Sequence, residues 1–112
     1  MVVLKFGIPC SQLADKIKDV DVHCTSEEQA MAIAAGCILC GKKPTVYMQN
    51  SGLFRVGDIV LSLYKPYKIP LPDLLLSIRH KPYHHHFAGL KTIKFLDLLE
   101  YDGKIEILEE NI

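Results

Sequence analysis

Polar side chains that can bind a ligand follow three apolar runs of this sequence. Glu27 comes shortly after the run VDVHC, and Gln49, Asn50 and Ser51 follow the run PTVYM directly. Arg79 ends a third run, LPDLLLSI. A carboxylate can exchange a proton, amides and hydroxyls donate and accept hydrogen bonds, and a guanidinium suits oxyanions. These residue types are candidates for one polar site built from three loops.

The segments that must position these residues alternate between strand-like and helix-like patterns. Short apolar runs predict strands over residues 2–8, 20–24, 44–48, 71–78 and 104–110, the last as an edge strand. Apolar residues at helical spacing predict helices over residues 11–20, 25–41, 54–67 and 90–99. This alternation predicts an α/β fold, a three-layer parallel sheet with helices on both faces.

In such a sheet, ligands bind in the crevice beyond the carboxyl ends of the strands. The three loops that carry Glu27, the QNSG stretch and Arg79 can therefore converge there. A plainer alternative is equally open, since Asn50 and Ser51 are also normal choices for an ordinary turn with a helix N-cap.

The helix predicted over residues 25–41 has a well-marked start. Two overlapping capping boxes are possible, Thr25 with Glu28 and Ser26 with Gln29, and Gly41 follows its end. Its body, AMAIAAGCILC, is apolar on every side, so it must be covered all round. In so short a chain, another subunit is expected to supply that cover.

The helix over residues 90–99 is expected to point Leu90, Ile93, Leu96 and Leu98 or Leu99 inward.

Length, charge and cysteine content set the class of protein. The 112 residues, 49% of them hydrophobic, predict a single domain over residues 1–112. Thirteen basic and thirteen acidic residues cancel, so no nucleic-acid partner is expected. No membrane span or secretory leader is apparent, which predicts a cytoplasmic protein. Cys10, Cys24, Cys37 and Cys40 are expected to be reduced, and the Cys37-x-x-Cys40 pair is interpreted as buried and structural rather than metal-binding or redox-active.

Four segments resemble a known family in their order and motifs: GIPCSQL, SEEQAMAIAAGCILCGKKPTVYMQNSGL, LSLYKPYKIPLPDLLLSIRH and HHHFAGLKTIKFLDLL. They resemble the pyrimidine-binding domain of thiamine-diphosphate-dependent decarboxylases, specifically the sulfopyruvate and phosphonopyruvate decarboxylase family. The resemblance covers residues 6–99, and MQNSGL is its most specific part. It implies the thiamine-diphosphate-binding fold, without the N-terminal helix that usually precedes the first strand.

The resemblance also implies roles for residues of the site. In the family, the helix-opening glutamate exchanges a proton with N1′ of the cofactor's aminopyrimidine ring. Family spacing places that role on Glu27 and leaves Glu28 to reach back to Thr25 as a capping box, although Glu28, or neither residue, remain alternatives. Cofactor contacts fall to the QNSG stretch, residues 49–52, in which Gly52 lets the backbone approach the ring.

Half of a cofactor site is missing from this sequence. The family holds the diphosphate and its Mg²⁺ with a Gly-Asp-Gly motif followed by an Asn, and nothing here matches it. The resemblance therefore implies a partner, the diphosphate-binding beta subunit, in a homo- and hetero-oligomer. No metal ligand is assigned to this chain.

Two further features depart from the family pattern. GLFR replaces Gly-Leu-Gly-Asn, so that Phe54 and Arg55 stand for a glycine and an amide and can reshape the site. The following loop is short, with His80 in a glycine position. The family's substrates are anionic 2-oxoacids, which implies contacts from Arg79, His80, Lys81 and His85. The alternatives for this loop are a solvated basic segment and a histidine-rich metal site.

The leading hypothesis is the alpha-subunit-like half of a thiamine-diphosphate-dependent decarboxylase. It would convert 3-sulfopyruvate to sulfoacetaldehyde and carbon dioxide, a step of coenzyme M biosynthesis. A phosphonopyruvate decarboxylase subunit is the enzyme alternative. The competing class is a non-catalytic partner subunit that keeps the fold and the subunit interface.

Overall fold

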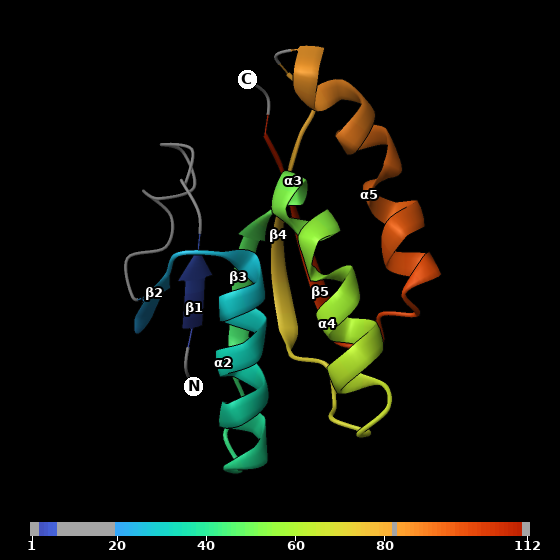
Figure 1. Cartoon of the computed structure of the whole chain (residues 1–112). Coiled ribbons are helices and arrows are strands. Elements are labelled where there is room, and N and C mark those ends of the chain that lie inside the picture. The colour runs from blue at the N-terminus through green and yellow to red at the C-terminus, as the bar shows by residue number, and fades with distance from the viewer. Residues whose placement is uncertain (1–2, 7–19, 82, 111–112) are drawn as a thin grey trace.

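The computed structural model describes residues 3–6, 20–81 and 83–110 of the chain. Its centre is a sheet of parallel strands in the order β2-β1-β3-β4-β5 (Figure 1). The strands are β1 (Val3–Phe6), β2 (Val22–Cys24), β3 (Thr45–Gln49), β4 (Asp73–Arg79) and β5 (Ile105–Glu110). The predicted parallel α/β sheet is confirmed, with β5 on one edge and the three-residue β2 on the other.

Helical segments connect these strands. They are α2 (Glu27–Leu39), α3 (Asn50–Leu53), a 3₁₀ turn (Phe54–Val56), α4 (Gly57–Ile59), a π turn (Val60–Tyr64), a second 3₁₀ turn (Tyr83–His85) and α5 (His86–Leu98). Residues 50–64 form one helical run of changing pitch that starts directly at the end of β3, four residues earlier than predicted. Residues 11–19 of the helix predicted over 11–20 lie outside the described part of the chain.

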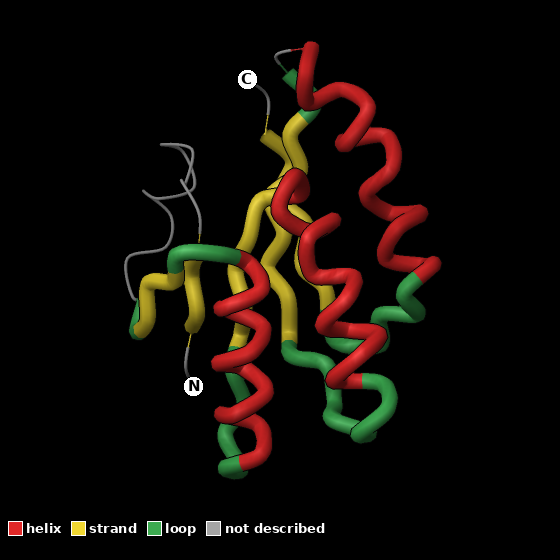
Figure 2. Tube along the Cα trace, viewed as in Figure 1, coloured by secondary structure: helices red, strands yellow, loops and turns green. Residues whose placement is uncertain are grey.

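The strand order decides which face of the sheet these helices cover. The connections from β2 to β3, from β3 to β4 and from β4 to β5 all run in the same direction across the sheet. Because parallel crossovers are right-handed, α2, the run over residues 50–64 and α5 must lie on the same face. Figure 2 shows these helices along one side of the strands.

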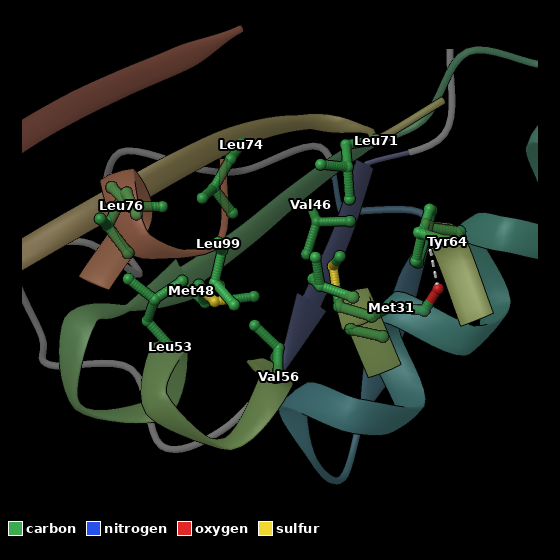
Figure 3. Packing of buried hydrophobic residues seen from close by; sticks show 14 of the residues in the cluster. Met31, Val46, Met48, Leu53, Val56, Tyr64, Leu71, Leu74, Leu76 and Leu99 are labelled. Carbon is green, nitrogen blue, oxygen red and sulfur yellow. Dashed lines mark hydrogen bonds between the residues drawn. The ribbon is translucent and has the colours of Figure 1, made fainter. Parts of the chain in front are cut away.

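The hydrophobic core fills the space between this face and the helices (Figure 3). Val46, Met48, Leu74, Leu76 and Ile78 come from the sheet, and the helices supply residues including Met31, Leu53, Val56, Leu96 and Leu99. The Tyr64 hydroxyl donates a 2.6 Å hydrogen bond to the Met31 carbonyl oxygen. Burial, reinforced by nearby Cys37, raises the Tyr64 pKa, so this hydroxyl keeps its proton as a donor.

The alternate residues of β3 and β4 point to the opposite face of the sheet. Tyr47, Gln49, Ser77 and Arg79 are among them, and none belongs to the core cluster. Tyr47 and Ser77 are nevertheless buried. The central strands are therefore buried on both faces, as their apolar sequences predict.

Helix α5 packs through a different face from the one predicted. It buries Gly89, Thr92 and Leu96, whereas Leu90 and Ile93 are 53% and 47% exposed. The expectation of an inward Leu90 and Ile93 is wrong, while Leu96 and the capping residue Leu99 are inside as expected. Gly89 and Thr92 face inward because the His80 ring packs against Gly89 and the Asn50 side chain donates a hydrogen bond to Thr92.

Helix α2 buries only part of its apolar circumference. Ala30, Met31, Ala34 and Ala35 face the core, while Ala32, Gly36 and Leu39 are exposed.

In the part of the chain that the structure describes, no helix has the length and apolarity to cross a membrane.

The described cysteines are free thiols in three different environments. Cys24 is buried, and desolvation raises the pKa of its thiol. Cys37 is half-buried, and Cys40 is exposed. The prediction of a buried Cys37–Cys40 pair is therefore wrong for Cys40, because α2 ends at Leu39 and Cys40 caps its exposed tip. Cys10 lies outside the described residues.

Candidate active site

The first turn of α2 is fixed by one capping box rather than two. Ser26 is the N-cap, and its Oγ accepts a 3.1 Å hydrogen bond from the Gln29 amide. The Gln29 side-chain oxygen reaches back and accepts from the Thr25 amide at 2.7 Å and from the Thr25 hydroxyl at 3.0 Å. Gln29 thereby takes the partner expected for Glu28, so the predicted Thr25–Glu28 box is wrong. Glu28 is exposed.

Glu27 opens α2 and lies against the turn that follows β3. Its side chain is half-buried, and a Cβ atom placed on Gly52 would overlap the Glu27 carboxyl group. Two loops from separate strand ends thus meet at this contact. The positive end of the α2 dipole favours a negative charge on a first-turn carboxylate. The arrangement puts a carboxyl group at the carboxyl edge of the sheet, in the space that the absent side chain of Gly52 leaves.

The QNSG stretch is the start of a helix rather than an ordinary turn. Asn50, Ser51 and Gly52 lie in α3, and the N-cap position is Gln49, which makes no side-chain capping bond. The alternative in which Asn50 or Ser51 serves as an N-cap is therefore wrong. Ser51 is exposed, and Gln49 is half-buried with a buried Nε2 that has no hydrogen-bond partner.

Asn50 ties three elements together from a fully buried position. Its Nδ2 donates to Thr92 Oγ1 of α5 at 3.1 Å, and its Oδ1 accepts from the Arg79 amide at the end of β4 at 3.1 Å. Thr92 Oγ1 in turn donates to the Ala88 carbonyl oxygen at 2.7 Å. The Asn50 side chain, predicted to contact a cofactor, is used inside the chain. It fixes the α3 turn relative to β4 and α5.

Replacing Asn50 with Ala is expected to destabilise the fold by about 2–4 kcal/mol. The substitution removes two hydrogen bonds, each contributing about 0.5–1.5 kcal/mol, and leaves the Arg79 amide without its partner, which costs about 1–3 kcal/mol, while Thr92 keeps its bond to Ala88. Urea unfolding followed by circular dichroism measures the change. Ser51→Ala, at the exposed neighbouring position, should change stability by less than about 0.5 kcal/mol. Equal effects of the two substitutions would contradict this role of Asn50.

Arg79 at the end of β4 and the residues that follow it differ in how far they are buried. Arg79 is half-buried, and a Cβ on Gly89 of α5 would overlap the half-buried His80 ring. Lys81 is exposed. His85 is half-buried, with its ring centroid 4.0 Å from that of His84. Across residues 3–6, 20–81 and 83–110, no three His, Cys, Asp or Glu side chains are grouped as metal ligands.

Phe54, which stands where the family has a glycine, packs toward α5. Its ring centroid is 4.9 Å from that of Phe95, at an interplanar angle of 51°. Phe95 also fills the space beside Gly57. The aromatic pair joins the run over residues 50–64 to α5, and Arg55 is exposed. The departure from the family pattern thus provides a packing contact between these two elements.

Gly89 and Thr92, which hold this geometry, had no role assigned from the sequence, and neither had Ser77, whose buried hydroxyl on β4 has no hydrogen-bond partner. Gly89 and Thr92 lie within the HFAGLKT segment, whose glycine and threonine match the family pattern. Their partners, His80 and Asn50, are distant along the chain, so local spacing could not assign them. Ser77 sits in an apolar strand, where a lone serine gives no signal.

Comparison with known proteins gives several related decarboxylases. An 82-residue segment is 37% identical to sulfopyruvate decarboxylase subunit alpha of Methanocaldococcus jannaschii, and covers 67% of this chain and 47% of that protein. A 72-residue segment is 37% identical to the Methanothermobacter thermautotrophicus subunit alpha, covering 58% and 44%. Phosphonopyruvate decarboxylase of Streptomyces viridochromogenes is 32% identical over 111 residues, covering 88% of this chain and 28% of that enzyme.

These similarities place the chain among homologues of decarboxylases. These relatives are named sulfopyruvate decarboxylase subunit alpha or phosphonopyruvate decarboxylase, so the resemblance noted in the sequence is confirmed. The chain spans about half the length of the alpha subunits that it matches. Protein-family models give no match to the chain.

Proposed function

We propose that this chain is the alpha-subunit-like part of a thiamine-diphosphate-dependent decarboxylase that converts 3-sulfopyruvate to sulfoacetaldehyde and carbon dioxide. The observation that carries the proposal is the contact between the Glu27 carboxyl group and Gly52. The names of the relatives support the reaction class and the substrate. Location in the cytoplasm, and a place in coenzyme M biosynthesis, stay predictions that accompany this function.

The residues of this edge fit the aminopyrimidine half of the cofactor. The half-buried Glu27 carboxyl group fills the space that a side chain at the buried Gly52 would take. Ser51 is exposed beside them, whereas the Gln49 side chain, predicted to contact the cofactor, leaves the other face of the sheet. Glu27 would hold N1′ of the ring, with Ser51 beside it. When bound, thiamine diphosphate supplies the electron sink that carbon dioxide loss requires.

The proposed task of Glu27 is to hold and move a proton at the ring nitrogen. General acid–base catalysis needs a group whose charged and neutral forms are both accessible. The half-buried Glu27 carboxyl group lies at the strand ends, against the turn that follows β3. Asn50 serves this task indirectly, because it fixes the turn against which the carboxyl group lies.

A second subunit is part of the proposal. The relatives are named subunit alpha, so those enzymes contain a further kind of subunit. This sequence has no Gly-Asp-Gly motif followed by an Asn, and the partner would therefore hold the diphosphate and Mg²⁺. The exposed apolar side of α2, at Ala32, Gly36 and Leu39, is available for such a partner to cover.

The test is reconstitution. The protein is mixed with a cognate diphosphate-binding subunit, thiamine diphosphate and Mg²⁺, and carbon dioxide release is measured with 3-sulfopyruvate, 3-phosphonopyruvate and pyruvate. The expected order of kcat/KM places 3-sulfopyruvate first. Preference for 3-phosphonopyruvate would support the enzyme alternative. A stable complex without turnover on any of the three would support the non-catalytic partner and overturn the proposed activity.

A further inference from the structure

Three polar side chains with unpartnered buried atoms lie together at the carboxyl end of the sheet. They are Gln49 on β3 and Ser77 and Arg79 on β4, through the atoms Nε2, Oγ and Nε. Gln49 and Ser77 are direct partners in the register of the two parallel strands. Arg79 is two residues beyond Ser77, so its side chain leaves the same face.

This face is the one that points away from the hydrophobic core. The intervening residues Met48, Leu76 and Ile78 all belong to the core cluster. Side chains alternate along a strand, so the three polar groups share the other face. Ser77 is fully buried and forms the floor of the group, while Gln49 and Arg79 are half-buried and border the surface.

The unpartnered atoms have matching chemistry. An amide Nε2 and a guanidinium Nε are donors only, and a serine hydroxyl can donate as well. Buried polar groups in folded proteins almost always have a partner, and the exceptions call for a bound water, ion or ligand. Three adjacent donors would be satisfied together by one group that offers several acceptor oxygens and no donor.

We propose that Gln49, Ser77 and Arg79 form a subsite for an oxyanion: a carboxylate, sulfonate or phosphonate group. Arg79 supplies the positive charge, Ser77 the buried hydroxyl and Gln49 the neutral amide donor. Identifying the occupant as one end of a 2-oxoacid substrate rests on the proposed function, whereas the subsite itself does not. Gln49 then faces the substrate's anion rather than the cofactor, and Ser77 joins the site as a binding residue.

The experiment uses one-group probes on the full protein, at constant ionic strength maintained with chloride. Acetate, methanesulfonate and methylphosphonate are titrated separately, with acetamide as the uncharged control, and the unfolding midpoint is followed. At least one anion is expected to raise the midpoint in a saturable way, and acetamide is not. The anion that binds tightest identifies the oxyanion that the subsite takes.

Ser77→Ala makes the test specific. In the absence of ligand, the substitution removes an unpartnered buried hydroxyl, so the midpoint should stay the same or rise by a few degrees. In the presence of the anion, affinity should fall by roughly tenfold or more, because a hydrogen bond to a charged group is lost. Arg79→Lys, which keeps the charge but moves the donor, should also weaken binding.

Matched controls come from exposed positions. Ser62→Ala removes an exposed hydroxyl that donates to Asp58 at 3.0 Å, and Arg55→Lys alters an exposed guanidinium; neither should change anion affinity. The inference is overturned if no anion raises the wild-type midpoint, if Ser77→Ala leaves the affinity unchanged, or if Ser77→Ala strongly destabilises the ligand-free protein. Cofactor and turnover play no part in this measurement. Failure here is therefore distinguishable from failure of the decarboxylase proposal.

Discussion

Glu27→Gln is expected to lower kcat of the reconstituted decarboxylase by about 10²–10⁴-fold, the usual contribution of a positioned acid–base group. The amide is close in size to the carboxyl group, so it can occupy the same place against Gly52. It cannot exchange a proton at the ring nitrogen. Carbon dioxide release under saturating cofactor and substrate measures the effect, and subunit assembly is followed in parallel by light scattering.

Glu28→Gln is the matched control for this prediction. Glu28 is the next residue along α2, carries the same charge near the same helix end, and is exposed. Its substitution should leave kcat within about twofold, since no contact with the turn is lost. A larger loss for Glu28→Gln than for Glu27→Gln would exchange the two roles. Unchanged turnover in both variants would remove the carboxylate from the mechanism.

Gly52→Ala is expected to lower kcat by about a hundredfold, the loss that follows when a catalytic group is displaced by about 1 Å. The added methyl group would overlap the Glu27 carboxyl group, which must move away from the α3 turn. Forcing an extra carbon into this contact should also cost about 1–3 kcal/mol of stability. Steady-state kinetics and urea unfolding measure the two effects separately.

Two comparisons isolate the cause of that loss. Gly36→Ala introduces the same methyl group into α2, where nothing lies within 4 Å of it, and should raise stability by about 0.5–1 kcal/mol. In a Glu27→Ala background the overlap at position 52 disappears. Gly52→Ala should then be nearly neutral for stability, giving a coupling energy within the range of about 0.5–3 kcal/mol typical of contacting residues. Additive effects would contradict direct contact between the Glu27 side chain and residue 52.

The strands were predictable because each is a short apolar run bounded by residues that interrupt regular structure. Val46 to Met48, followed by Gln49 and Asn50, located both a buried strand and the edge at which the site lies. Glu27 was identifiable from its distance to Gly36 in the family pattern. The convergence of its loop with the QNSG turn then followed from the parallel fold, in which successive strand ends meet at one edge, whereas the direct contact with Gly52 was not predicted.

The packing partners of polar residues were not predictable. Helix α5 is apolar on more than one side, so Leu90 and Ile93 were as plausible inside as Leu96. Thr92 and Gly89 determine which face of α5 is buried, because Thr92 accepts a hydrogen bond from Asn50 and the His80 ring packs against Gly89. The capping box shows the same limit, because Glu28 and Gln29 both satisfy the local pattern. Only the three-dimensional path of the Gln29 side chain to Thr25 decides between them.

The two borders of the sheet restrict how this chain can join other polypeptides. β2 offers only three residues for backbone pairing, and the outer strand β5 carries the exposed, charged Glu106. Short outer strands and charged side chains both discourage strand addition by a neighbouring molecule. Continuous intermolecular sheets are consequently disfavoured, and quaternary assembly is directed to side-chain packing on the helical surfaces.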